Sequence, residues 1–338
     1  MIRMVGVPDL WPRIVRYDWR AVKASGAAKF EPSSSSIPAA AASGCLPEVR
    51  MKKLLLQLDP DRHPSSFDRI VAYDAGADEV MSRGGVTEEE VRDLVHGCIF
   101  TRGSKDLRNT AVFIGGTDMS AGEKLLAAAK KAVFADFRIS MMLDSNGSNT
   151  TAVAAVEKIS RAVGDLKDKR ILVTAGTGPV GTRAAGLFAK AGAHVTITSR
   201  KTEEGERIRK AIADRFGGDV HAVVMHDSSE AGRIMDEVKP QILLSTGPAG
   251  VMLVPHDAWA GRPGLTVACD LNAVPPLGIE GIEVTDSATK RDGVTAFGAL
   301  GVGGFKMKVH KRCIARLFES NDAVLDAESI AEVAREIE

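Results

Sequence analysis

The sequence predicts an α/β protein built from two domains. At 338 residues, the chain is longer than one typical domain. From Met51 onward, short apolar runs typical of buried strands alternate with helical patterns, the order that produces parallel sheets covered by helices. Near the middle, an apolar strand runs directly into a glycine-rich turn that opens a helix. Two such units would leave a ligand cleft between them.

The first domain is expected over residues 51–163. Its expected strands are 52–58, 79–82, 111–114 and 138–143, and its helices are 66–75, 88–98, 121–134 and 149–163. The last helix crosses to the second domain. Ser148 or Asn149 is expected to cap its start, because both side chains can accept a hydrogen bond from a free backbone N–H.

The second domain, residues 164–303, opens with a dinucleotide-binding pattern. A strand beginning at Arg170 leads into Gly-x-Gly-x-x-Gly and then into a helix, as in a Rossmann fold. The first glycine makes the tight turn, the second admits a pyrophosphate, and the third allows close packing of helix on sheet. Free N–H groups at the helix start favour the phosphates. The expected contacts are Gly176, Thr177, Gly178, Pro179, Val180 and Gly181.

The end of the next strand indicates which dinucleotide binds. An NAD-selective site usually has a carboxylate there, about 20 residues on. This chain instead has Ser199, Arg200 and Lys201, with no carboxylate until Glu203. Cations and hydroxyls suit a 2′-phosphate, so NADP is expected and NAD is possible. The alternative is that Arg200 and Lys201 are only a solvated strand end.

Further strands are expected at 220–224, 241–246 and 265–271. Two final helices, at 304–319 and 326–336 within residues 304–338, are expected to return to the first domain. Residues 1–50 include a Ser/Ala/Pro-rich stretch without sustained periodicity, so we expect a disordered extension and regard Met51 as the start of the functional chain.

Composition excludes several classes of protein. Lys+Arg and Asp+Glu both number 44, so no global charge favours nucleic acid or an anionic membrane. No apolar run reaches the roughly 18 residues of a spanning helix. Cys45, Cys98, Cys269 and Cys313 lack metal-ligand spacing, which favours reduced thiols in a cytoplasmic protein and no metal site.

Three polar segments are expected to face the cleft. The first, Asp144–Thr151, follows a strand and opens the linking helix; Asp144 and Thr151 are its better candidates for ligand contact. The second is the basic turn Thr101–Lys105, which could equally be a solvated loop. In the third, Phe297–His310, Lys306 is expected in the first turn of a helix, where a cation opposes the helix dipole. Such a local conflict points to function, although Lys306 could also simply extend to water.

Several of these segments resemble the NADP-dependent methylene-tetrahydromethanopterin dehydrogenases over nearly all of residues 51–338. The resemblance rests on five stretches: Met142–Thr151, Ala175–Gly181, Asn272–Gly278, Phe297–Lys306 and Leu317–Ser320. It implies a catalytic α/β domain facing a Rossmann domain. The implied reaction is reversible hydride transfer from the methylene carbon of the pterin to NADP, which gives the methenyl cation.

The resemblance also implies roles for residues. Lys306 matches an active-site lysine of that family, and Thr246 and Asn272 join the expected cofactor contacts. Hydride transfer depends mainly on positioning and water exclusion. Like charge would oppose a cation, so Lys306 is expected to position the pterin or cofactor. We expect no metal, nucleic-acid or membrane partner, and we expect the protein to form a homo-oligomer.

Two alternatives remain open at this point. A tetrahydrofolate-linked or shikimate-type dehydrogenase could use the same architecture. A protein of another class, a non-catalytic NADP sensor, would bind the cofactor tightly without turnover.

Overall fold

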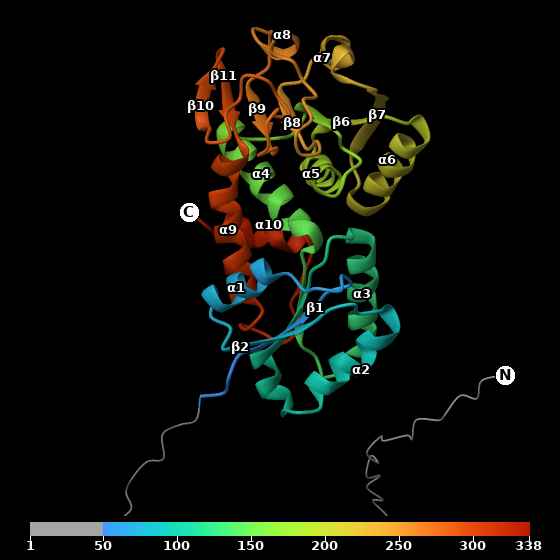
Figure 1. Ribbon diagram of the computed structural model, residues 1–338, viewed down its shortest axis with the longest axis vertical. Helices are drawn as coiled ribbons and strands as arrows, with labels where there is room; N and C mark the ends of the chain where they lie inside the picture. The colour runs from blue at the N-terminus through green and yellow to red at the C-terminus, as the bar shows by residue number, and fades with distance from the viewer. Residues whose placement is uncertain (1–49) are drawn as a thin grey trace, which may run out of the picture. The chain divides into compact units, whose positions relative to one another are not determined.

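The computed structural model describes residues 50–338. The expected N-terminal extension and Cys45 therefore lie outside the described residues, except for Arg50. Residues 50–338 form one compact unit that contains two sheets. Figure 1 shows these sheets with helices α4, α9 and α10 between them.

The first sheet has five parallel strands in the order β12-β4-β3-β1-β2. Its central strand β3 is buried along its whole length, as expected for a strand covered by helices on both faces. The strands are β1 (Leu54–Leu58), β2 (Glu79–Arg83), β3 (Thr110–Ile114), β4 (Ser140–Leu143) and β12 (Val324–Leu325). Helices α1 (Ser66–Asp74), α2 (Glu88–Ile99) and α3 (Met119–Ala132) connect them.

Local side chains set where these helices begin. Ser65 accepts a hydrogen bond from the Asp68 amide at the start of α1. Thr87 and Glu90 form a capping box at α2. The third helix was expected over 121–134 but runs from Met119 to Ala132. Its start shifts because the Asp118 carboxylate accepts from the first free N–H groups.

The second sheet has seven strands in the order β10-β11-β9-β8-β5-β6-β7. All pair in parallel except the hairpin of β10 (Ser287–Arg291) and β11 (Val294–Phe297), which the sequence analysis missed. Asp292 and Gly293 turn this hairpin with positive φ, and the Asp-Gly pair is the signal that could have found it. The other strands are β5 (Arg170–Thr174), β6 (His194–Ser199), β7 (Asp219–Val224), β8 (Ile242–Ser245) and β9 (Val267–Asp270). The helices are α5 (Pro179–Lys190), α6 (Thr202–Phe216), α7 (Ala231–Val238) and α8 (His256–Trp259).

Three helices pack between the sheets: α4 (Ser148–Val163), α9 (Ala299–Arg316) and α10 (Ala327–Arg335). Gly147, with φ 56°, is the N-cap of α4, so the expectation that Ser148 or Asn149 caps it is wrong. Helix α9 begins five residues before the expected position 304, because the glycines after Gly298 continue the helix instead of preceding it. Lys306 is therefore well inside α9, and the argument from an unfavourable dipole at the first turn is wrong.

A buried arginine connects the two sheets. Arg183 of α5 is 4% exposed, and its Nε donates to Asn149 Oδ1 of α4 at 3.1 Å. Its Nη2 donates to the Glu123 carboxylate of α3. Arg215 of α6 also reaches Glu123, at 3.3 Å, and Glu328 of α10, at 2.8 Å. Helices α3, α4, α5, α6 and α10 thus share one hydrogen-bonded network.

Replacement of Arg183 should therefore destabilise the whole fold. Arg183→Met leaves the buried Asn149 oxygen without its donor, and we expect a loss of about 1–3 kcal/mol in the free energy of unfolding. Urea titration followed by circular dichroism measures this loss. The control is Arg207→Met, because Arg207 is exposed and pairs with Glu204 on its own helix. Equal losses in both variants would contradict the role of Arg183.

Candidate active site

A cavity of about 450 Å³ opens at the carboxyl ends of the first sheet's strands. Thr151 and Lys306, both expected in the site, line it together with Asn146 and Gly147. The segment after β1 and the start of α1, which sequence reasoning missed, supply much of the remaining wall: Asp59, Asp61, His63, Ser65, Phe67 and Asp68. A polar run directly after an apolar strand was the available signal.

Lys306 lies half-buried at this cavity. Its Nζ is 3.3 Å from His310 Nδ1 and 4.7 Å from the centre of the Phe67 ring, a cation–π distance. A Cβ on Gly147 would be 3.7 Å from the same Nζ, and the φ of Gly147 is positive, so a glycine suits this turn. The ammonium is therefore enclosed by an aromatic ring, an imidazole and backbone.

Asp144 lies behind the cavity wall and is not among the lining residues. It is 1% exposed, and its carboxylate accepts from the Thr150 amide at 2.9 Å and from the Thr150 hydroxyl at 2.6 Å. Burial raises the pKa of Asp144 to about 7, and the positive charge of Lys306 opposes part of this rise. Asp144 thus holds the start of α4 and carries a carboxyl group that titrates near neutral pH.

Two further carboxyl groups concentrate negative charge at the cavity. Burial raises the pKa of Asp68, with Lys306 acting in the opposite direction. Burial also raises the pKa of Asp59, which accepts from the backbone amides of Asp61 and Ser65. Phe67, which is 50% exposed, presents an aromatic face beside these groups. The cavity therefore combines one cation, several carboxyls and a flat apolar surface.

The glycine turn after β5 requires glycine at two of its three glycine positions and leaves space at the third. A Cβ at Gly176 would lie 2.7 Å from Ile197 Cβ, and one at Gly181 would lie 2.6 Å from Thr246 Oγ1, so packing requires both glycines. At Gly178 the nearest atom to such a Cβ is 3.6 Å away. Nothing in the described protein fills that position, which leaves the backbone open to a ligand at the start of α5.

Thr177 and Pro179 line a second cavity, of about 680 Å³, together with Arg183 and residues of α3 and α6. Thr117 lines both this cavity and the one that holds Lys306. The Asp61 carboxylate fixes Thr117 by accepting from its amide at 2.9 Å and its hydroxyl at 3.1 Å. The cavity beside the glycine turn and the Lys306 cavity therefore share Thr117 as a lining residue.

The remaining expected cofactor residues lie at strand ends of the second sheet. Arg200 and Lys201 are exposed after β6, and neither forms an ion pair within residues 50–338. Ser199 is buried, and its hydroxyl donates to the Lys201 carbonyl at 2.8 Å. Thr246 donates to the Thr174 carbonyl at 2.9 Å, whereas the Asn272 amide donates to the carbonyls of Pro248 and Pro276. Thr246 and Asn272 thus shape the loops around the turn.

The expectation that Thr101–Lys105 faces the cleft is wrong. Arg102 donates to the Asn109 carbonyl at 2.8 Å and to Thr110 Oγ1 at 3.0 Å. These contacts place the basic turn at the amino end of β3, whereas Lys306 lies at the carboxyl ends.

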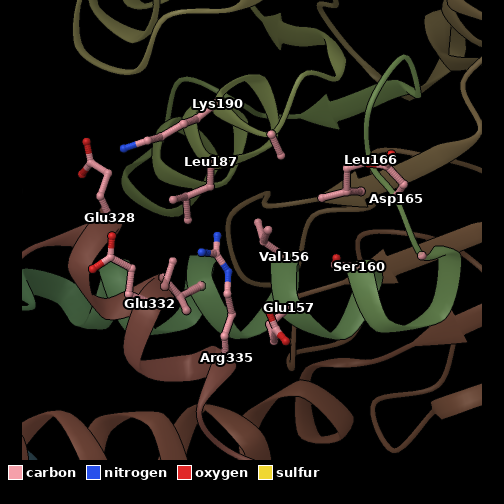
Figure 2. A pocket seen from close by; sticks show the side chains of 14 residues that line it. Val156, Glu157, Ser160, Asp165, Leu166, Leu187, Lys190, Glu328, Glu332 and Arg335 are labelled. Carbon is pink, nitrogen blue, oxygen red and sulfur yellow. The ribbon is translucent and has the colours of Figure 1, made fainter.

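A third hollow, of about 350 Å³, lies between α4, α5 and α10. Figure 2 shows Lys190 extending toward Glu328, and Arg335 directed toward Leu187 across the hollow. It shares no lining residue with the two cavities that adjoin at Thr117. We therefore do not assign it to the candidate active site.

Within residues 50–338, no three His, Cys, Asp or Glu side chains gather as a metal site would require. No helix in this range combines the length and hydrophobicity needed to cross a bilayer. Cys98, Cys269 and Cys313 are buried and unpaired among the described residues.

The raised pKa of Asp144 predicts a pH-dependent effect on stability. The folded protein binds this proton more tightly than the unfolded chain, so the contribution of Asp144 is full below about pH 4 and is lost as the pH rises through about 7. As the pH rises from about 4 to about 7, the free energy of unfolding of Asp144→Asn should rise relative to that of the wild type, by up to about 4 kcal/mol. Urea titrations at several pH values measure the difference, with the exposed Asp257→Asn as control. A difference that does not change with pH would contradict the assignment.

Comparison with known proteins identifies the family to which this chain belongs. A family model described as the N-terminal part of methylene-tetrahydromethanopterin dehydrogenase matches residues 66–146. The chain is 45% identical over 287 residues to a "Bifunctional protein MdtA" of Methylorubrum extorquens, covering 85% of this chain and 99% of that protein. It is 34% identical over 295 residues to an NAD(P)-dependent methylenetetrahydromethanopterin dehydrogenase of the same organism, with the same two coverages.

Among solved structures, quinate dehydrogenase from Corynebacterium glutamicum in complex with NAD is similar, with a TM-score of 0.49, 11% identity, and coverage of 85% of this chain and 99% of that one. The two sequence relatives share far more residues with this chain than the solved structure does, and this chain covers 99% of each relative. The chain belongs to the methylene-tetrahydromethanopterin dehydrogenase family.

Proposed function

We propose that this protein catalyses reversible hydride transfer from methylene-tetrahydromethanopterin to NADP, giving methenyl-tetrahydromethanopterin. The observation that carries the proposal is Thr117, which lines both the Lys306 cavity and the cavity beside the glycine turn. Family membership supplies the substrate class, since a relative is named for this reaction with an NAD(P) cofactor.

The experiment that tests the proposal is an absorbance assay of NADPH formation with methylene-tetrahydromethanopterin. Parallel assays with methylene-tetrahydrofolate and shikimate address the other dehydrogenases. Tight NADP binding without turnover on any of these substrates would instead support a cofactor sensor.

The cofactor side of the site fits a dinucleotide. The open position at Gly178 and the free N–H groups at the start of α5 would hold the pyrophosphate. Ser199, Arg200 and Lys201 would bind the 2′-phosphate at the end of β6, and Thr246 and Asn272 would shape the nicotinamide end. When bound, NADP supplies the nicotinamide carbon that takes up the hydride.

The pterin side is proposed from the chemistry of the Lys306 cavity. A flat heterocycle with several N–H donors suits the exposed Phe67 face and the carboxyls of Asp59 and Asp68. Lys306 would donate to a carbonyl of the ring, because its own charge repels the cation that forms. The negative carboxyls would favour that cation electrostatically.

Asp144 and Thr151 have different proposed roles. Thr151 lines the cavity, and its hydroxyl would donate to or accept from a ligand bound there. Asp144 would act through α4 and through its charge, which opposes that of Lys306.

The domain scheme, with residues 51–163 holding substrate, 164–303 holding cofactor and 304–338 returning to the first domain, is part of the proposal. The cytoplasmic location and homo-oligomeric state stay predictions.

Cofactor choice gives a direct test of Arg200. Arg200→Ala removes a guanidinium that would pair with the 2′-phosphate, so the Kd for NADP should rise roughly tenfold to a hundredfold while that for NAD changes little. Fluorescence titration with both cofactors measures the difference. Arg209→Ala, at a partly exposed arginine that pairs with Glu206, is the control. Equal losses for NADP and NAD would remove Arg200 from the 2′-phosphate site.

Lys306→Met keeps the aliphatic stem and removes only the ammonium. If Lys306 orients the pterin, kcat/KM should fall at least about a hundredfold, roughly 2.7 kcal/mol of transition-state stabilisation. NADP affinity should change little, because the phosphates bind at the glycine turn. Lys308→Met, at an exposed lysine on the same helix, is the matched control. Near-wild-type turnover of Lys306→Met would overturn the role, and an equal loss of NADP binding would make Lys306 a cofactor residue.

A further inference from the structure

We propose that His310 is a positioning residue that holds the Lys306 ammonium in place by accepting a hydrogen bond at Nδ1. The inference rests on the proposed function for its kinetic consequence, although the hydrogen bond itself can be tested without any substrate. Lys306 and His310 are one helical turn apart on α9, so both side chains lie on the same face of the helix.

The imidazole ring is fixed on several sides. His310 is 0% exposed, and its ring stacks on Phe113 of β3 with centroids 5.6 Å apart and planes at 19°. The Phe67 ring lies 6.3 Å away at a tilt of 46°. Phe67 therefore contacts both members of the pair, since its ring centre also lies 4.7 Å from the Lys306 ammonium. An acceptor held this rigidly gives the flexible lysine one defined direction.

The chemistry of the pair decides which imidazole nitrogen carries the proton. An ammonium has only donors, so Nδ1 must be unprotonated to accept from it at 3.3 Å. Burial, with the nearby charge of Lys306, lowers the pKa of His310 to about 3, so the ring is neutral at physiological pH. The proton therefore resides on Nε2.

The charged groups facing the imidazole agree with this tautomer. The Asp144 carboxylate lies 3.9 Å from Nδ1, which is too long for a hydrogen bond, and its oxygens already accept from Thr150. If Nδ1 carried the proton, it would point at an ammonium that has no lone pair.

The other nitrogen shows that this histidine is costly to the fold. His310 Nε2 is buried and has no hydrogen-bond partner among the described residues. A phenylalanine would fill the same aromatic stack without an unpaired polar atom, so stability alone does not explain a histidine here. A hydrogen bond accepted by Nδ1 does explain it, because an unpaired buried polar atom such as Nε2 is tolerated where a functional site requires it.

The tautomer is tested by NMR of protein labelled with ¹⁵N-histidine. The His310 signals, assigned by their loss in His310→Phe, should show a protonated Nε2 and a bare Nδ1 between about pH 6 and 8. Lys306→Met should shift the Nδ1 signal, whereas Lys308→Met should not. A protonated Nδ1, an imidazolium at pH 6, or an Nδ1 signal unchanged in Lys306→Met would overturn the proposal.

Kinetics separate positioning from a structural role. His310→Phe keeps the stacked ring and removes the acceptor, whereas His310→Asn places a carbonyl oxygen close to the position of Nδ1. We expect kcat to fall at least about tenfold in His310→Phe and to recover several-fold in His310→Asn, with the Kd for NADP unchanged in both. Equal kcat in the two variants, per folded molecule, would overturn positioning. An absence of pterin turnover in the wild type would instead refute the proposed function, and the NMR result would still decide the contact.

Discussion

The need to satisfy buried polar groups between β4 and α4 constrains the whole molecule. Asp144, Ser145, Ser148, Asn149 and Thr150 are each at most 1% exposed. Each finds a partner: Ser145 donates to the Gly115 carbonyl, Ser148 to that of Ser145, and Asn149 to that of Leu143. Asn149 then accepts from Arg183, which brings α5 against α4. Helix α5, which follows the glycine turn, and the end of β4 are thus parts of one hydrogen-bonded structure.

This constraint also sets the electrostatics of the site. The same buried segment holds Asp144 where its carboxyl is poorly solvated, and it provides the Gly147 turn beside the Lys306 ammonium. Phe67 and His310 then leave the ammonium little freedom. A site fixed in this way before ligands bind suits hydride transfer, in which the distance between two carbons controls the rate.

The sequence was most informative for features that depend on backbone geometry, such as the glycine turn. The fold class and the strand-turn-helix around Gly176 followed from local pattern, because each glycine has a steric requirement. Other site residues depend on tertiary contacts that no local pattern contains. Phe67 and Asp68 reach Lys306 only because α1 and α9 pack together. The start of α9 was placed too late because a run of glycines normally argues against helix, and packing between the sheets overrides that preference. Asp144 and Thr151 were both expected to contact a ligand, but the structure places only Thr151 among the residues that line the cavity.

The two-residue strand β12 has a consequence for synthesis of the chain. β12 completes the first sheet beside β4, where the Met141 amide donates to the Ala323 carbonyl and Ser140 donates to that of Ser320. β4 and its neighbour β12 are therefore separated by about half the length of the chain, with the entire second sheet between them in sequence. On the ribosome, the edge of β4 stays unpaired until β12 emerges, which happens only after the whole second sheet has been made. A nascent chain of this protein therefore carries an open strand edge from the emergence of β4 to that of β12, and an unpaired edge is a template for pairing with other chains.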